Sequence, residues 1–284
     1  MKPGKLRYLK LGLVVVLALL LAFPLSAEAK KKSRKKSGPY RVSANAALLY
    51  DDSGWHKYYA RDIEQKVLPA STTKIMTALL VLERLNLNDV VTVTPAATNV
   101  LPSKIDLKAG EKYRVRDLLF AALLNSANDA SVALAYAVSG SQDKFVKLMN
   151  KRAQQLGAKR TVFANPHGLP SDRAQYTTAY DMYLIFRAAL RKEFFREAIK
   201  IRSMTIRSLD GRTIALKSHN KAFFKSWKQG VYGKTGYTRA AQACFIGFVD
   251  KGRQRLIVAV FGCPGSTRWD DIKYIVEHYG GIDL

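Results

Sequence analysis

The sequence predicts an α+β fold in which an antiparallel sheet is flanked by helices and a helical subdomain is inserted between its strands. Segments with strand composition and turn signals lie towards both ends, within residues 42–61 and 230–262. Apolar segments with helical spacing fill the middle of the chain, within residues 71–199. Because the helical segments lie between the strand segments in the sequence, the sheet and the helices can bury their apolar faces only by packing against each other as layers.

The strand segments are separated by turn residues. Strands are expected at residues 42–50, 55–61, 204–209 and 212–217, and three more within 230–262. Asp51-Asp52-Ser53-Gly54 separates the first two segments, and Asp210-Gly211 separates the next two. Asp-Gly is a strong hairpin signal because glycine adopts a positive φ without a steric penalty.

The helical segments differ in how much surface they are expected to bury. Helices are expected at residues 71–85, 115–124, 128–138, 141–156, 179–199 and 269–279. The segment 71–85 is apolar around most of its circumference, so it should lie inside the molecule. Asn125-Ser126-Ala127 interrupts two apolar helices, whereas 141–156 and 179–199 have amphipathic patterns.

The first 39 residues have the composition of an export signal followed by a basic arm. A basic start, an apolar run at residues 11–23 and Ala27-Glu28-Ala29 indicate a signal peptide at residues 1–29. An uncleaved membrane anchor is the alternative interpretation of this segment. Residues 30–39 are expected to be a disordered arm, and residues 30–36 contain six basic side chains. Residues 40–284 would then form a single domain.

The charge of the chain bears on its partners. The formal net charge is +25 at pH 7. An exported protein seldom meets nucleic acid, so we expect no nucleic-acid partner and predict that residues 30–36 attach to an anionic envelope surface. The four histidines show no metal-ligand spacing, and we expect neither a metal nor a cofactor.

Two cysteines lie in the expected C-terminal hairpin. Cys244 and Cys263 are nearly equidistant from the turn, so they could face each other across paired strands. A disulfide and two buried free thiols both remain open, because disulfide geometry is demanding.

A candidate nucleophile and base lie at the start of the most apolar helix. Ser71 and Lys74 have the Ser-x-x-Lys spacing, which places hydroxyl and amine on one helix face. Burial lowers the pKa of a lysine, and a neutral amine can take the proton of a serine. Copies of the motif occur at 33–36, 141–144 and 218–221, but these lie in polar surroundings. A helix N-cap is the structural alternative for Ser71.

Two further short motifs fit the same chemistry. Ser126 and Asn128 lie at the break between two helices, where a hydroxyl can relay a proton and an amide can hold a substrate carbonyl. Lys234 and Thr235 begin a strand and suit a substrate carboxylate, while Gly236 would let a substrate backbone approach closely. Helix capping and an ordinary edge-strand lysine are the structural alternatives.

The three motifs occur in the order used by the penicillin-binding protein and serine β-lactamase superfamily. The segments LPASTTKIMTALLVLE, LLNSANDAS, FANPHGLP, TTAYDM and GKTGYT resemble the low-molecular-weight D-alanyl-D-alanine carboxypeptidases over roughly residues 40–278. The resemblance implies a penicillin-binding protein-like fold, a peptidoglycan stem peptide as substrate and β-lactams as inhibitors. It implies an acylated Ser71, Lys74 as its general base, and Ser126 and Asn128 as proton relay and substrate contact.

The resemblance also implies how the substrate would bind along the strand that begins with Lys234 and Thr235. Lys234 and Thr235 would bind the terminal D-alanine carboxylate, with help from Arg268, and Gly236 would allow close approach. The backbone N–H groups of Ser71 and Tyr237 would form the oxyanion hole. Ala241-Gln242-Ala243 departs from the family's Ala-Gly-aromatic run, which leaves specificity open. His167 is interpreted as a structural residue.

The expected activity is therefore removal of the terminal D-alanine from stem peptides by an exported serine D,D-carboxypeptidase. A D,D-endopeptidase that cleaves cross-links with the same residues is the first alternative. A β-lactamase is the second, although the Glu-x-x-Leu-Asn sequence of class A enzymes is missing between residues 129 and 233. A non-catalytic wall-binding protein is the third, and the intact motifs argue against it.

Overall fold

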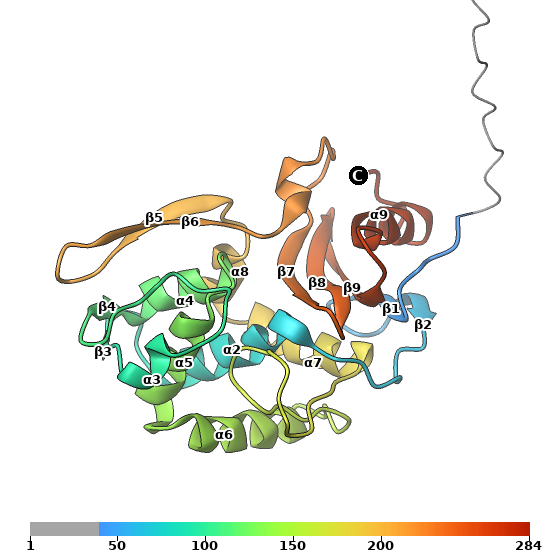
Figure 1. The fold of residues 1–284 in the computed structure, drawn as a ribbon. Helices are drawn as coiled ribbons and strands as arrows, with labels where there is room; N and C mark the ends of the chain where they lie inside the picture. Colours follow the sequence, from blue (N-terminus) through green and yellow to red (C-terminus); the bar gives the residue numbers. More distant parts are fainter. Residues whose placement is uncertain (1–39) are drawn as a thin grey trace, which may run out of the picture. The chain divides into compact units, whose positions relative to one another are not determined.

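The computed structural model describes residues 40–284, and the expected signal peptide and basic arm lie outside the described residues. Its main sheet has five strands in the order β2-β1-β9-β8-β7, and all neighbours pair antiparallel. These strands are β1 (Ala46–Asp51), β2 (Lys57–Arg61), β7 (Tyr232–Thr238), β8 (Gln242–Lys251) and β9 (Gln254–Cys263). Segments from both ends of the sequence thus form one sheet (Figure 1), which confirms the predicted α+β architecture.

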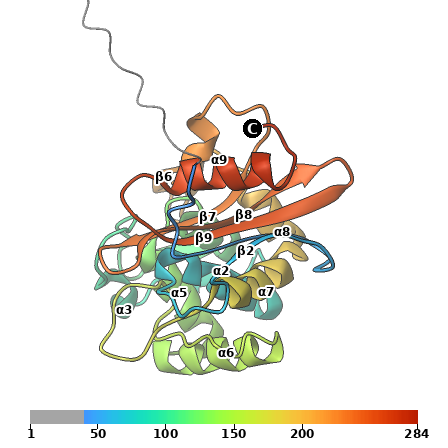
Figure 2. The same cartoon turned by 90° about the vertical axis from the view of Figure 1, so that its right-hand side faces the viewer.

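Both faces of the central strands are buried, which explains their nearly continuous apolar sequences. Successive side chains of a strand point to opposite faces. Accordingly, Leu48 packs in the cluster on the helical side, while the neighbouring Leu49 packs in the cluster beneath α9 (Arg268–His278). Figure 2 shows α9 on one side of the sheet and α2 and α7 on the other. The central strands therefore have no face towards solvent, and polar residues need not alternate with apolar ones along them.

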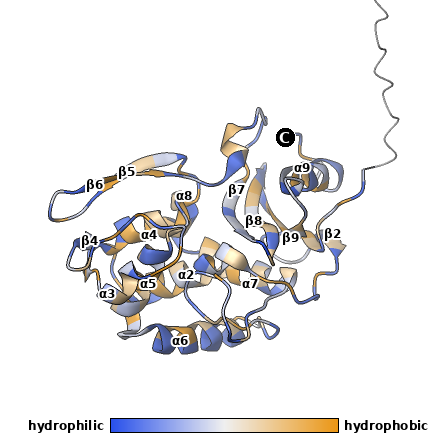
Figure 3. Cartoon of the chain, in the orientation of Figure 1, coloured by the Kyte–Doolittle hydropathy of each residue, from blue (hydrophilic) through white to orange (hydrophobic). Residues whose placement is uncertain are grey.

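The inserted helical region lies between β2 and β7 in the sequence. It contains the 3₁₀ turn η1 (Ala70–Thr73) and the helices α2 (Lys74–Arg84), α3 (Pro95–Thr98), α4 (Val115–Leu123), α5 (Asn128–Ser139), α6 (Gln142–Gln155), α7 (Ala179–Leu190) and α8 (Glu193–Ala198). As its sequence predicts, α2 is buried from its first residue to Val81. The outer helix α6 is largely hydrophilic in colour (Figure 3) because only four of its residues are buried.

Smaller elements complete the fold. A hairpin joins β5 (Ser203–Arg207) to β6 (Thr213–Lys217), as the Asp-Gly signal predicts. Four elements had no sequence prediction: the short helix α3, the strands β3 (Val90–Thr92) and β4 (Lys112–Arg114), and the 3₁₀ turn η2 (Lys221–Phe224). Within residues 40–284, no helix has both the length and the apolar content needed to cross a bilayer.

One predicted helix is wrong in its extent. Residues 179–199 form two helices, α7 and α8, separated at Arg191 and Lys192. Phe195 of α8 packs against Phe186 of α7 with ring centroids 5.8 Å apart, so both helices bury their aromatic residues in the same core. The separation therefore follows from tertiary packing rather than from a glycine or proline.

The two cysteines are free thiols in this structure. Cys263 pairs with Ala243, and a register shift between Ala243 and Phe245 leaves Cys244 without a partner on β9, while on its other side Cys244 pairs with Gly236 of β7. Cys244 belongs to the core on the helical side of the sheet and Cys263 to the core beneath α9. Of the two alternatives left open by the sequence, the structure has the buried thiols.

Candidate active site

Ser71 lies in η1, at the entrance to the buried helix α2. Ala70 precedes it with a φ of +46°, a left-handed conformation that disfavours an L-residue by about 1–2 kcal/mol. Lys74 Nζ lies 3.0 Å from Ser71 Oγ. Residues three positions apart share a helix face, so this contact follows directly from the motif spacing.

Lys74 is completely buried and forms no ion pair within the described residues. Its Nζ donates to Asn128 Oδ1 at 2.8 Å and to the His167 carbonyl at 2.9 Å. Burial lowers the pKa of Lys74 well below its usual value of 10.5, and the charge of Lys234 lowers it further. The buried carboxylate of Asp129 opposes this shift. The environment therefore favours a neutral amine beside the Ser71 hydroxyl.

A second lysine–serine pair comes from elements far apart in the sequence. Lys234 on β7 donates to Ser126 Oγ at 2.9 Å and to the Thr235 carbonyl at 3.1 Å. Ser126 occupies the connection between α4 and α5 with a φ of +58°. Lys234 is also buried, and burial together with the charge of Arg268 lowers its pKa to about 7. Near neutral pH this group can thus exist as a cation or as an amine.

Asn128 is the first residue of α5 and links Lys74 to another segment. While its Oδ1 accepts from Lys74, its Nδ2 donates to the Leu101 carbonyl at 3.0 Å, and its backbone N–H donates to the Ser103 carbonyl at 2.8 Å. The sequence analysis expected this amide to hold a substrate carbonyl. In this structure both ends of the amide already have protein partners.

The loop around His167 encloses Lys74 from a third direction. The His167 carbonyl contacts Lys74, and its ring Nδ1 accepts from the Leu169 N–H at 3.2 Å. Burial and the charge of Lys74 lower the pKa of His167 to about 3, so the imidazole stays neutral. Gly168 has a φ of +84°, and a Cβ there would lie 1.8 Å from the Ala70 carbonyl oxygen. A glycine is therefore required for this loop to close over η1.

This backbone contact of His167 was missed by the sequence analysis. A carbonyl oxygen has no residue-type signature, so only the Asn165-Pro166-His167-Gly168 turn could have indicated it. The ring itself makes only a local hydrogen bond, in keeping with the structural interpretation of this histidine.

The outer strand β7 passes directly beside η1. At Gly236, a Cβ would lie 3.1 Å from the Ser71 backbone nitrogen, which shows how closely the two backbones approach. Thr235 is buried, whereas Tyr237 is 63% exposed. Arg268, the first residue of α9, donates from Nη1 to the Gly236 carbonyl at 3.0 Å and to the Cys244 carbonyl at 2.7 Å. Its buried Nε has no hydrogen-bond partner.

The site thus brings together lysines, hydroxyls, an amide and backbone N–H groups. Within residues 40–284, no three His, Cys, Asp or Glu side chains cluster in a way that could hold a metal ion. Neither buried lysine forms an ion pair within residues 40–284, and Lys234, when it is protonated, would repel a cation and attract an anion. The arrangement suits acyl transfer on a substrate with a carboxylate.

Solved structures with this fold define the class of protein. The crystal structure of a D-alanyl-D-alanine carboxypeptidase from Mycobacterium tuberculosis H37Rv aligns with a TM-score of 0.79 and 31% identity, over 87% of this chain and 94% of that chain. The Streptomyces K15 DD-transpeptidase aligns with a TM-score of 0.79 and 26% identity, over 87% of this chain and all of that chain. The fold is that of the penicillin-binding proteins, as predicted.

Sequence comparison specifies the family. The chain belongs to the D-alanyl-D-alanine carboxypeptidase family, whose model matches residues 30–265. The carboxypeptidase DacF of Bacillus subtilis is 35% identical over 258 residues, which cover 89% of this chain and 65% of that protein. The carboxypeptidase DacB2 of Mycobacterium tuberculosis is 35% identical over 214 residues, which cover 74% of this chain and 72% of that protein.

Proposed function

We propose that this protein is an exported serine D,D-carboxypeptidase that removes the terminal D-alanine from peptidoglycan stem peptides through a Ser71 acyl-enzyme. Family membership supports the reaction class. The observation that carries the mechanism is the 3.0 Å contact between Ser71 Oγ and the fully buried amine of Lys74. A hydroxyl needs an adjacent base to become a nucleophile, and burial makes this lysine suitable.

The hydrogen bonds of Lys74 support its role as general base. A neutral amine has two N–H donors, which the Asn128 Oδ1 and the His167 carbonyl can accept. The lone pair then faces the Ser71 hydroxyl and takes its proton. As Oγ bonds to the penultimate D-alanine carbonyl carbon, the backbone N–H groups of Ser71 and Tyr237 hold the oxyanion.

The second half of acylation releases D-alanine. The tetrahedral intermediate re-forms the carbonyl, the C–N bond breaks and the leaving amine takes a proton through Ser126. Water then attacks the acyl-enzyme, which releases the shortened peptide and restores Ser71. Asn128 stabilises this relay through its contact with Lys74 and would also contact the substrate once its bond to the Leu101 carbonyl opens.

Binding of the substrate carboxylate is assigned to the β7 edge. Lys234 supplies the cation, Thr235 supplies a hydroxyl, and Gly236 allows the peptide to lie against the strand. Arg268 holds the Gly236 carbonyl and adds positive charge nearby. A bound carboxylate would favour the charged form of Lys234, because opposite charges raise the pKa of a lysine.

D-alanine release from a linear stem pentapeptide tests this function. The purified full-length chain should release one D-alanine per peptide, and Ser71→Ala should lose this activity. Ser141→Ala is the matched control, because Ser141 has the same motif spacing but caps α6 through the Lys144 N–H. No release by the unaltered chain, or equal release by Ser71→Ala, would reject the proposal.

Export and surface attachment form a separate part of the proposal. Residues 1–29 act as the export signal, and the basic residues 30–36 attach the protein to an anionic envelope surface. Liposomes containing anionic lipid should bind the protein, and neutral liposomes should not. Deletion of residues 30–37 should abolish this binding, and unchanged binding would contradict the assignment.

A further inference from the structure

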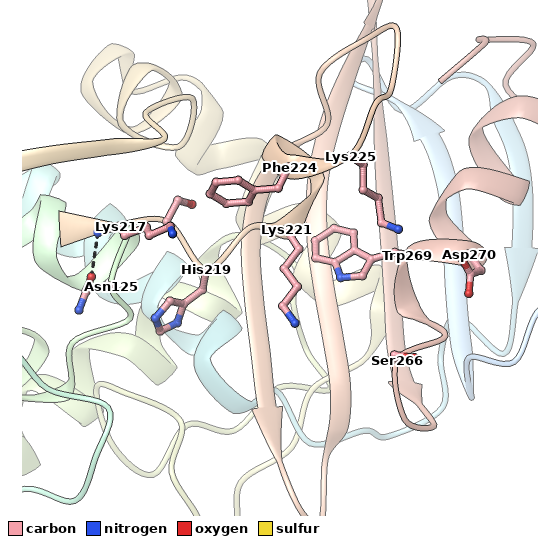
Figure 4. Close-up of a pocket in the computed structure, with 10 residues that line it drawn as sticks. Asn125, Lys217, His219, Lys221, Phe224, Lys225, Ser266, Trp269 and Asp270 are labelled. Atoms are coloured by element: carbon pink, nitrogen blue, oxygen red, sulfur yellow. Dashed lines mark hydrogen bonds between the residues drawn. The ribbon is translucent and has the colours of Figure 1, made fainter. Parts of the chain in front are cut away.

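Two of the hollows in the described surface lie in different surroundings. One, of about 790 Å³, is lined by Lys217, His219 and Trp269 among others (Figure 4). It adjoins the candidate active site, because the His219 N–H donates to the Leu124 carbonyl, two residues before Ser126. The other, of about 220 Å³, lies beside the turn that joins β1 to β2 and has no role in the reaction above.

Aromatic rings form the inside of this smaller hollow. Tyr50, Tyr180 and Tyr183 line it, with their ring centroids 5.4–6.5 Å apart. Tyr50 and Tyr183 are buried and form its floor. Trp55 lines it as well and is 85% exposed. Aromatic surface that faces a hollow, unlike a single exposed ring, is typical of a ligand site.

The turn holds Trp55 beside the hollow through contacts of its neighbours. Asp51 Oδ1 accepts from the Gly54 N–H at 2.7 Å, and the Asp51 carbonyl accepts from the Tyr183 hydroxyl at 2.9 Å. Gly54 has a φ of +85°, and a Cβ there would lie 3.0 Å from Arg187 Nη1. The turn therefore packs directly against α7, which gives the hollow a defined shape.

The charges that line the hollow are positive. Arg187 and Lys57 line it, each 5.8 Å from the ring centroid of a floor tyrosine, and no carboxylate lines it. Within residues 40–284, neither cation forms an ion pair. Of the two acids in the turn, Asp51 accepts hydrogen bonds inside the turn and Asp52 pairs with Arg255 at 3.6 Å. Two positive charges can thus meet an anion.

A sugar ring that carries an anionic group fits these features. The faces of a pyranose are C–H groups, which can pack on the electron-rich faces of aromatic rings. Its hydroxyls lie at the edge, where the Ser53 hydroxyl and the two cations can pair with them. A phosphate or carboxylate suits a guanidinium, whose planar N–H groups match two oxygens. The volume lies below the roughly 300–1,000 Å³ of sites for larger ligands, so it suits a single ring.

The hollow lies far from the candidate active site along the sheet. Gly236, beside η1, pairs with Cys244 near one end of β8. Near the other end of the sheet, Leu256 pairs with Asp51, where the turn begins. Leu256 also pairs with Val249, which is five residues, or roughly 16 Å, along β8 from Cys244. A ligand in the hollow would therefore leave the catalytic cleft open.

We propose that this hollow binds an acidic glycan through one anionic sugar ring, with Trp55 and the tyrosines against the ring and Arg187 and Lys57 beside its anion. The binding does not depend on the reaction of Ser71, and only the assignment of the glycan to the cell wall rests on the proposed function. A wall glycan bound there would raise the local concentration of peptide substrate at the cleft without occupying it.

An NMR titration of the full-length chain with isotope-labelled tryptophan tests this site. The chain has three tryptophans, and Trp55→Phe identifies the indole N–H signal of Trp55. N-acetylmuramic acid presents a carboxylate on a sugar, and N-acetylglucosamine 1-phosphate presents a phosphate. At least one should shift the Trp55 signal and leave those of Trp227 and Trp269 unchanged, and the probe that binds identifies the kind of acidic glycan. Neutral N-acetylglucosamine should bind about tenfold more weakly.

Matched variants separate the two parts of the site. Arg187→Gln should remove the preference for the acidic sugars, whereas Arg191→Gln, exposed at the end of the same helix, should keep it. Trp55→Ala should weaken binding by about tenfold or more in ligand-observed NMR, and Leu209→Ala, at another exposed apolar side chain, should not. Thermal unfolding and D-alanine release from the soluble pentapeptide should be unchanged in Trp55→Ala.

Several outcomes would overturn the inference. These are an unchanged Trp55 signal with both acidic sugars, and equally tight binding of neutral N-acetylglucosamine or of inorganic phosphate alone. A shift of Trp269 in place of Trp55 would assign the sugar to the larger hollow, and a Trp55 shift seen only with anionic liposomes would assign the turn to a lipid surface. Each of these results leaves D-alanine release untouched, so the proposed function stands or fails separately.

Discussion

Two segments of this chain have the same Ser-x-x-Lys spacing at the start of a helix, and their surroundings differ completely. Ser71 and Lys74 lie against the core, and the amine of Lys74 contacts the hydroxyl at 3.0 Å. Ser141 caps α6, where its hydroxyl accepts from the backbone N–H of Lys144, while the Lys144 side chain extends into solvent. The same spacing thus places a buried amine beside a hydroxyl at Ser71, and only caps a helix at Ser141.

The difference between the two pairs lies in what surrounds the lysine. Water hydrates the exposed side chain of Lys144, whereas burial of Lys74 beside a second cation lowers the pKa of Lys74. Asn128 and the His167 carbonyl then orient the buried amine. The motif therefore acquires chemical meaning from residues that lie 54 and 93 positions away.

The largest expected effect is on the rate of acylation, when Lys74 is replaced by arginine and compared with the same replacement at Lys144. Lys74→Arg keeps a positive charge but removes the base, because a guanidinium does not lose its proton in proteins. Acylation by penicillin should slow by about 10²–10⁴-fold, while Lys144→Arg should have no effect. Stopped-flow acylation rates provide the measurement, and thermal unfolding confirms that both variants fold. A Lys74→Arg variant within tenfold of the unaltered protein would show that Lys74 is not the base.

A smaller effect is expected from two glycines that both have positive φ. A Cβ at Gly168 would lie 1.8 Å from the Ala70 carbonyl oxygen, whereas one at Gly140 meets nothing within 4 Å. Gly168→Ala should therefore push the His167 loop away from Lys74 and lower the free energy of unfolding by about 3 kcal/mol or more. Gly140→Ala should lower it by only about 1 kcal/mol, from backbone strain alone. Urea unfolding measures both, and equal losses would mean that the loop does not depend on this contact.

The smallest effect concerns stability and its dependence on pH. Lys234 has a pKa of about 7 in the folded protein and 10.5 as its usual value. Below about pH 7 it is charged in both states, so folding bears the full penalty of a buried cation. Between about pH 7 and 10.5 only the unfolded state keeps the proton, and stability rises with pH. Lys234→Met should therefore stabilise the protein at pH 6 by about 1–2 kcal/mol.

The exposed Lys144 provides the control for this prediction about the buried Lys234. The advantage of Lys234→Met should shrink as the pH rises from about 7 towards 10.5. Lys144→Met, at the surface copy of the motif, should stay within about 0.5 kcal/mol of the unaltered protein at every pH. Thermal unfolding across this pH range measures both variants. A Lys234→Met variant that is less stable than the unaltered protein at pH 6 would contradict the conclusion that the buried charge of Lys234 destabilises the fold.

The sheet could be predicted from the sequence because burial on both faces gives β8 and β9 unbroken apolar runs. The short strands β3 and β4 could not, since each has three residues of which only one is buried. The separation of α7 from α8 was also beyond reach. Arg191 and Lys192 are good helix formers, and it is the docking of Phe195 against Phe186 that requires the change of direction.

In the site, local spacing predicted the contact between Ser71 and Lys74, and short motifs indicated Ser126, Asn128 and Lys234. Sequence could not show that Asn128 contacts Lys74 or that a backbone carbonyl at His167 completes its surroundings. Nor could it show the hollow whose wall combines Lys217 of β6, Lys221 of η2 and Trp269 of α9. Contacts of this kind depend on tertiary structure and leave no pattern at a fixed spacing.

The central claim is that Ser71, alone among the Ser-x-x-Lys serines, is the acylated nucleophile. The most direct test is to incubate the full-length chain with a penicillin and locate the covalent adduct by peptide mass spectrometry, beside Ser71→Ala and Ser141→Ala. We predict one long-lived adduct on Ser71, which is absent from Ser71→Ala and unchanged in Ser141→Ala. An adduct on another serine, no adduct with the penicillin intact, or rapid destruction of the penicillin as by a β-lactamase would contradict this account.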